Sequence, residues 1–321
     1  MTDDTLRLRV RIDAPTDTVF EALTDADSLT DWLAESADVS LEDNRYQFWG
    51  RYAPQGDRPR QQLLAAEPAE ALSFTWAFDD AAGSGDAGGS GDAGGAHPSR
   101  VDVTMAPDDD GGTVLTVVHT GVPTSGTADT TALDCFWHVS LANLAAQCEG
   151  LPTMPPFDFS VPAQGDALVR TVIDVPPDEV FACLLDPTQV DKWANAIHSA
   201  SAPLGGTPDR INGDANHSAK AVIEPVVGGR YDFGWSDDGP TQVLELEPDK
   251  VLAYSWRYPN SPDTVVRWAL RSSRGSTYLT LVHSGFDNDR LAEEFRQGWP
   301  GFLVEIKRIL ELGDRWEPLK L

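Results

Sequence analysis

Cysteine and lysine are both scarce in this chain of 321 residues. The three cysteines, Cys135, Cys148 and Cys183, form no Cys-x-x-Cys pair. We therefore expect neither a disulfide framework nor a cysteine-based zinc site. Lysine occurs at only five positions, and 51 acidic residues give a formal net charge of −27. Such a surface repels the phosphates of nucleic acids, so no nucleic acid partner is predicted.

Long apolar runs and catalytic signatures are also absent from the sequence. No apolar run approaches the ~18 residues of a membrane span, so no membrane partner is expected. The acidic start, Met1 to Asp4, has no apolar core of a signal peptide, which favours a cytoplasmic protein. No His-x-His, nucleophile-elbow or phosphate-loop motif stands in a suitable context. The sequence therefore predicts no catalytic residue, no metal and no cofactor.

The acidic residues are mostly aspartate, and the few bases are mostly arginine. This balance resembles that of halophilic archaeal proteins. Salt at high concentration screens dense like charge, so such a surface is tolerated there. We interpret the acidity as an adaptation to a salty cytoplasm and not as a site for a basic partner.

The sequence contains a long internal repeat. Residues 9–32 align without gaps on residues 170–193, with ten identities in 24 positions. Further matches pair Trp76 with Trp256, and the Val-His-x-Gly run at 118–121 with that at 282–285. A period of about 160 residues indicates two whole domains rather than a solenoid of short units.

The boundaries of these domains can be predicted from composition. We expect a first domain at 1–150, a proline-rich linker at 151–166 and a second domain at 167–321. A run of glycine, serine, alanine and aspartate at 81–99 predicts a flexible loop inside the first domain.

Each half shows the same order of hydrophobic patterns. Alternating apolar residues at 6–12 predict a strand, and short helices follow up to Trp32. A meander of about five or six antiparallel strands comes next, in which Tyr46, Phe48 and Tyr52 are expected on one face. Apolar spacing from Trp137 to Cys148, and from Trp299 to Leu312, predicts a closing amphipathic helix. The fold class is therefore α+β, with an antiparallel sheet covered by one helix.

The ordered motifs resemble a known superfamily. They include Ala14-Pro15-x-Asp17-x-Val19-Phe20 in the first copy and Gly228-Gly229-Arg230-Tyr231-x-Phe233 in the second. The chain resembles the SRPBCC (START/Bet v 1-like) superfamily, in particular the family named for homology to the activator of heat-shock-protein-90 ATPase. This resemblance implies two tandem helix-grip domains, each a curved sheet wrapped on a long C-terminal helix around a cavity. The first copy departs from it at Glu42-Asp43-Asn44-Arg45, where the second has Gly-Gly-Arg.

Candidate binding residues are two histidines and the aromatic rows. The period of two places His119 and His283 on the apolar face of a strand, where each can orient a ligand or simply fill the core. Ten tryptophans suggest an aromatic cup for a hydrophobic ligand, although core packing is the alternative at each position. Besides the histidines, the predicted ligand-binding residues are Trp76, Trp137, Tyr231, Phe233, Trp235, Tyr254, Trp256, Trp268 and Trp299, with Trp32 and Trp193 near the mouth.

Three functions are consistent with these patterns. The first is non-catalytic binding of a hydrophobic small molecule in one or both domains. The second is a protein-interaction module, an ATPase co-chaperone as the resemblance implies, which predicts a filled core and an exposed apolar patch. The third is a cyclase or aromatase that uses one of the two histidines as a base.

Overall fold

The structure is a computed structural model that describes residues 5–78, 98–123, 128–198, 220–235, 238–259 and 261–319. The chain divides into two compact units, residues 1–160 and 161–320, which we call the first and second domain. Residues 81–97 of the predicted loop lie outside the described residues. Ser99, which the sequence pattern places in that loop, is the first residue of a strand.

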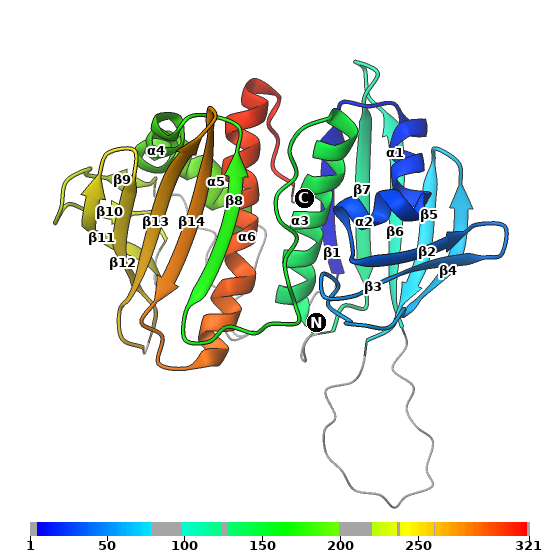
Figure 1. Cartoon of the computed structure of the whole chain (residues 1–321), viewed down its shortest axis with the longest axis horizontal. Helices are drawn as coiled ribbons and strands as arrows, with labels where there is room; N and C mark the ends of the chain where they lie inside the picture. Colours follow the sequence, from blue (N-terminus) through cyan, green and yellow to red (C-terminus); the bar gives the residue numbers. More distant parts are fainter. Residues whose placement is uncertain are drawn as a thin grey trace, which may run out of the picture. The chain divides into compact units, whose positions relative to one another are not determined.

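The first domain begins with a strand, continues with helices and a strand meander, and ends with a long helix (Figure 1). Its elements are β1 (Thr5–Ile12), α1 (Thr16–Thr24), α2 (Ala26–Trp32), β2 (Ser36–Ser40), β3 (Arg45–Trp49), β4 (Gln61–Glu67), β5 (Ala71–Trp76), β6 (Ser99–Pro107), β7 (Thr113–Thr120) and α3 (Thr130–Glu149). The main sheet is antiparallel with the order β1-β7-β6-β5-β4, and β2 pairs with β3 in a separate two-stranded sheet.

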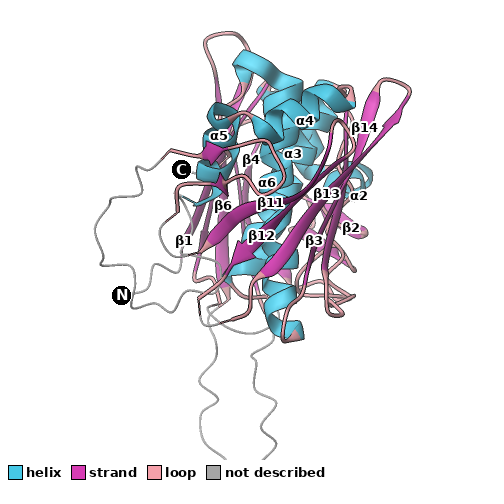
Figure 2. Cartoon of the chain, turned by 90° about the vertical axis from the view of Figure 1, so that its left-hand side faces the viewer, coloured by secondary structure: helices cyan, strands magenta, loops and turns pink. Residues whose placement is uncertain are grey.

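The second domain repeats this plan. Figure 2 shows its strands β11, β12 and β13 in magenta. Its elements are β8 (Ala167–Ile173), α4 (Pro177–Leu185), α5 (Pro187–His198), β9 (Val222–Ile223), β10 (Tyr231–Asp232), β11 (Gly239–Glu247), β12 (Val251–Arg257), β13 (Thr264–Ser273), β14 (Ser276–Ser284), α6 (Asp289–Leu312) and a short 3₁₀ helix (Gly313–Arg315). The antiparallel sheet has the order β11-β12-β13-β14-β8, and β9 pairs with β10.

The long closing helix covers the sheet in each domain. Helix α3 lies against β1, and α6 lies against β8 and β14. Both begin earlier than the apolar spacing predicted, because a polar side chain caps each start: Asp129 accepts from the backbone of α3, and Asn288 from that of α6. The two domains are thus α+β helix-grip units, as predicted. None of the described helices is long and apolar enough to cross a membrane.

One predicted strand assignment is wrong. Tyr52 was expected to share a face with Tyr46 and Phe48, but β3 ends at Trp49. The chain turns at Gly50, whose φ of 109° is unfavourable for residues with a side chain. Tyr52 therefore lies beyond the strand.

The connection between β9 and β10 brings a loop against β11, the edge strand of the second sheet. Gly228 N donates to Val243 O at 2.8 Å, and Val243 N donates to Gly229 O at 2.9 Å. A Cβ atom on Gly229 would lie 2.4 Å from Glu224 O, whereas one on Gly228 would meet nothing within 4 Å. The Gly-Gly pair of the sequence motif therefore allows the loop to approach the strand closely, and the loop covers part of the open edge of the sheet.

We predict that Gly229→Ala destabilises the protein more than Gly228→Ala. The alanine at 228 suffers only the strain of its φ of 86°, about 1 kcal/mol, while that at 229 must also displace backbone. The free energy of unfolding, measured by denaturant titration of both variants and wild type, checks this. Equal losses would show that the loop tolerates a shift at Gly229.

Candidate functional site

His119 and His283 occupy equivalent positions on the core faces of β7 and β14. Both side chains are completely buried, with 0% exposure. In β7 the buried residues Leu115, Val117 and His119 alternate with half-buried ones, so the strand period places the imidazole under the closing helix. The predicted orientation of the two histidines towards the interior is what the structure shows.

In the first domain His119 is the centre of a directed chain of hydrogen bonds. Trp137 Nε1, on α3, donates to His119 Nδ1 at 3.1 Å. Because Nδ1 accepts, the neutral ring carries its proton on Nε2, which lies 2.8 Å from Ser99 Oγ. Ser99 Oγ in turn donates to Trp76 O at 2.8 Å. The chain joins α3 to β7, β6 and β5.

The second domain contains the same arrangement. Trp299 Nε1 donates to His283 Nδ1 at 3.2 Å, and His283 Nε2 lies 2.7 Å from Thr264 Oγ1. Thr264 Oγ1 completes the chain by donating to Trp256 O at 3.4 Å. We call this set of tryptophan, histidine, hydroxyl and carbonyl the histidine relay. In both domains it occupies both ring nitrogens of the histidine.

Burial makes these histidines poor bases. It lowers the pKa of His119 and of His283 to about 3, because the charged ring would lose its hydration. Both rings are neutral at pH 7, and an efficient general base has a pKa near the working pH. The relay is therefore suited to holding strands and helix together and is poorly suited to proton transfer.

Aromatic rings surround the relay in the first domain. The Trp76 ring is stacked on His119 with centroids 5.5 Å apart and meets Trp137 edge-on at 6.0 Å. Phe136 contacts the same indole at 5.2 Å and stacks on Phe48 at 6.0 Å. The rings fill the space between the sheet and α3 in the geometry that aromatic pairs prefer.

The second domain is packed in the same manner. Tyr231 stacks on Tyr254 with centroids 4.4 Å apart, and Trp268 Nε1 donates to Tyr254 Oη at 3.0 Å. Trp256 contacts Trp299 at 5.4 Å and Phe233 at 6.0 Å. These contacts join β10, β12 and β13 to α6 through their side chains.

Nearly all the predicted ligand-binding residues are sealed in these clusters. A void that holds water leaves the side chains around it partly exposed. The predicted residues other than Trp235 are only 0–3% exposed: Trp32, Trp76, Trp137, Trp193, Tyr231, Phe233, Tyr254, Trp256, Trp268, Trp299, His119 and His283. Ligand binding at these positions stays a prediction, and their packing is that of a filled core.

Trp32 and Trp193 each join two helices, and their predicted position near the mouth of a cavity stays a prediction. Trp32 Nε1 donates to Ala22 O at 3.0 Å, which joins α2 to α1. Trp193 Nε1 donates to Cys183 O at 3.4 Å and joins α5 to α4. The equivalent bonds in the two domains give both residues a structural role.

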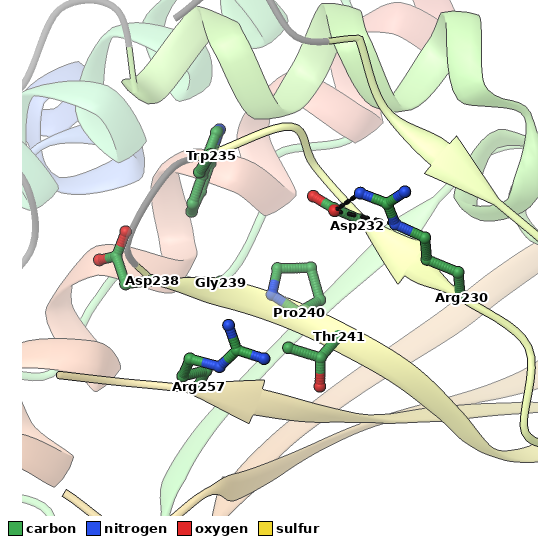
Figure 3. Close-up of a pocket in the computed structure, with 8 residues that line it drawn as sticks. All are labelled: Arg230, Asp232, Trp235, Asp238, Gly239, Pro240, Thr241 and Arg257. Atoms are coloured by element: carbon green, nitrogen blue, oxygen red, sulfur yellow. Dashed lines mark hydrogen bonds and ion pairs between the residues drawn. The ribbon is translucent and has the colours of Figure 1, made fainter. Parts of the chain in front are cut away.

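Trp235, one of the predicted ligand-binding residues, lies beside a pocket. The pocket has a volume of about 340 Å³ and is shown in Figure 3. It is formed by β10, the start of β11 and the end of β12, and its lining residues are Arg230, Asp232, Trp235, Asp238, Gly239, Pro240, Thr241 and Arg257. Apart from Trp235, the sequence analysis assigned none of them to a site, although Arg230 belongs to the Gly-Gly-Arg motif that the first copy lacks.

Three exposed apolar side chains lie on the edge strand β11 and on the loop that pairs with it. Val226 is 60% exposed, Val227 is 65% exposed and Leu244 is 43% exposed. The bond from Gly228 N to Val243 O brings the two valines to the strand that carries Leu244. We call these three residues the valine patch. In the first domain the corresponding turn carries Leu41 and Glu42 in place of the two valines, and Asp43 and Asn44 in place of the two glycines.

Fold and site define the class of this protein: two helix-grip domains in one chain, each with a buried aromatic core built around a histidine relay. Residues 13–149 and 174–311 match the model of the family described as Activator of Hsp90 ATPase homolog 1-like protein. The chain belongs to this family, which confirms the resemblance and the two tandem copies. No match was found among curated proteins.

Solved structures give similar folds at low identity. Protein MLL2253 from Mesorhizobium loti is 23% identical, with a TM-score of 0.36 over 46% of this chain and 98% of that one. The Aha1 dimer from Colwellia psychrerythraea is 21% identical, with a TM-score of 0.34 over 47% and 99%. DynU16, from the dynemicin biosynthetic locus, is 16% identical with a TM-score of 0.31 and covers 97% of this chain and 98% of its own.

We predict that Trp137→Phe costs more stability than Trp76→Phe. Both changes shrink a buried ring, but only the first leaves His119 Nδ1 without its donor. Trp76 Nε1 has no hydrogen-bond partner among the described residues, so its loss removes no bond. An orphaned buried acceptor adds about 1–3 kcal/mol. Denaturant unfolding of both variants measures the difference, and equal losses would mean that the bond contributes nothing.

We predict that stability falls with pH below 6.5. The folded pKa of each relay histidine, about 3, lies below its ordinary value of 6.5, so between these values the unfolded chain binds more protons. Each histidine then lowers the free energy of unfolding by about 1.4 kcal/mol per pH unit. Denaturant titrations from pH 7 to 5 measure this, above the range in which carboxylates dominate. The double variant His119→Gln and His283→Gln should give a flatter profile; an unchanged slope contradicts the assignment.

Proposed function

We propose that this chain is a non-catalytic protein-interaction module that contacts its partner through the valine patch of the second domain. The observation that carries the proposal is the contrast between filled cores and an exposed patch. The aromatic side chains under the closing helices are 0–3% exposed, whereas Val226 and Val227 are more than half exposed. Apolar side chains that stay in water are stabilised when a partner covers them.

The proposed partner is an ATPase of the Hsp90 chaperone class. The description of the family to which the chain belongs names the activation of this ATPase. The partner surface should offer an apolar contact for the two valines and Leu244, and this contact supplies most of the affinity.

The packing argues against the two other functions. Carriage of a hydrophobic small molecule requires the buried indoles and phenols to separate, because close-packed rings leave no room for a ligand. Cyclase or aromatase chemistry requires a usable base, and the two histidines are neutral, enclosed and hydrogen-bonded at both nitrogens. The buried Cys183 thiol offers no substitute nucleophile, because burial raises its pKa to about 12.

We predict that Leu244→Asp reduces stimulation of the ATPase of a purified Hsp90-class chaperone at least tenfold. A charge at an apolar contact loses the burial energy and adds a desolvation cost. Leu168→Asp is the matched control, because Leu168 on β8 is 42% exposed and Leu244 is 43% exposed. The measurement is the steady-state ATPase rate of the chaperone against the concentration of the full chain.

Two outcomes would overturn the proposal. One is a chaperone rate that the wild-type chain leaves unchanged. The other is saturable one-to-one uptake of a hydrophobic fluorescent probe that His119→Gln or His283→Gln abolishes, which would restore the carrier hypothesis. Equal loss of stimulation in the Leu168 and Leu244 variants would place the contact elsewhere on the domain.

A further inference from the structure

One side of the pocket in the second domain carries the exposed, positively charged side chain of Arg257. Arg257 ends β12, and its backbone is fixed by pairing with Gly239 of β11. Its side chain is exposed and has neither an ion pair nor a hydrogen bond within the described part of the chain. Figure 3 shows the guanidinium turned towards the middle of the lining residues. A free guanidinium presents a planar fork of donors that matches a carboxylate.

The second arginine of the pocket is already neutralised. Arg230 Nε donates to Asp232 Oδ2 at 3.1 Å, and Asp232 Oδ1 accepts from Gly234 N at 2.7 Å. These bonds fix the turn after β10 and hold Arg230 along the wall of the pocket. Arg257 is therefore the group from which a negatively charged ligand gains most.

The indole of Trp235 forms a flat wall of the pocket, and core contacts hold it in place before any ligand binds. A Cβ atom on Gly239 would lie 3.2 Å from Trp235 Cε3, so glycine is the residue that lets the indole lie on the strand. The ring also contacts Phe233 at 5.1 Å and Trp256 at 5.8 Å. A wall held by the core loses little entropy when a ring stacks on it.

We propose that this pocket binds a small organic carboxylate that carries a flat ring. The carboxylate pairs with Arg257, and the ring lies on Trp235. The volume of about 340 Å³ equals that of roughly eleven water molecules, which suits a ligand with a single ring.

The first domain lacks these determinants. Counting from the aligned Trp76 and Trp256, Ala77 stands where the second domain has Arg257. Tyr46-x-Phe48 aligns with Tyr231-x-Phe233, so Gly50 of the first domain corresponds to Trp235 of the second. The proposal therefore predicts one site per chain, although the fold is present twice.

Isothermal titration of the full chain with 4-hydroxybenzoate tests the proposal. The expected result is saturable binding of one molecule per chain. Binding of 4-hydroxybenzamide at the same ionic strength should be at least tenfold weaker, because the amide has no charge to pair with Arg257.

Variants locate the site. Arg257→Gln and Trp235→Leu should each raise the Kd at least tenfold, while Arg271→Gln, at an exposed position of β13, leaves it unchanged. Circular dichroism checks that each variant is folded. The proposal is overturned by the absence of saturable binding, by equal affinity for the amide, or by unchanged affinity in Arg257→Gln. None of these results depends on a chaperone partner, so the two proposals are tested separately.

Discussion

The hydrogen bond from a helix tryptophan to a strand histidine connects the two layers of each domain. Trp137 donates to His119, and Trp299 donates to His283, at 3.1 and 3.2 Å. Because the donor comes from the closing helix and the acceptor from the sheet, the bond fixes how the helix lies on the strands. It also sets the tautomer of the ring, so that its single N–H, on Nε2, faces the hydroxyl on the neighbouring strand. The neutral state of the histidine and the packing of the rings around it follow from this arrangement.

Much of the fold was predictable because local patterns decide it. The repeat, the period-two strands and the final apolar stripes identified both domains and the inward direction of His119. The filling of the core was not predictable, because a ring that lines a hollow and a ring that packs on another ring have the same sequence pattern. Ser99 shows the same limit: it follows a glycine-rich run, yet tertiary pairing with β5 and β7 places it in a strand. The Arg257 pocket was missed because Arg257 comes from a different strand than the other lining residues, which lie between Arg230 and Thr241.

The two domains keep their cores alike and differ at one edge of the sheet. The relay needs only a hydroxyl beside the histidine, so Ser99 and Thr264 serve equally. The loop before β10, by contrast, carries valines and the Gly-Gly pair only in the second domain, and Arg257 has no counterpart. Edge loops can change without disturbing core packing, which is why new binding properties arise there more readily than inside the core.

Each relay draws every one of its atoms from a single domain. Severing the chain anywhere between Glu149 and Ala167 would remove no donor or acceptor from either one. A duplicated gene therefore inherits a self-sufficient polar core in each half. One domain can therefore keep its surface while the other accumulates substitutions. Neither domain needs a compensating change in the other to keep its polar core intact.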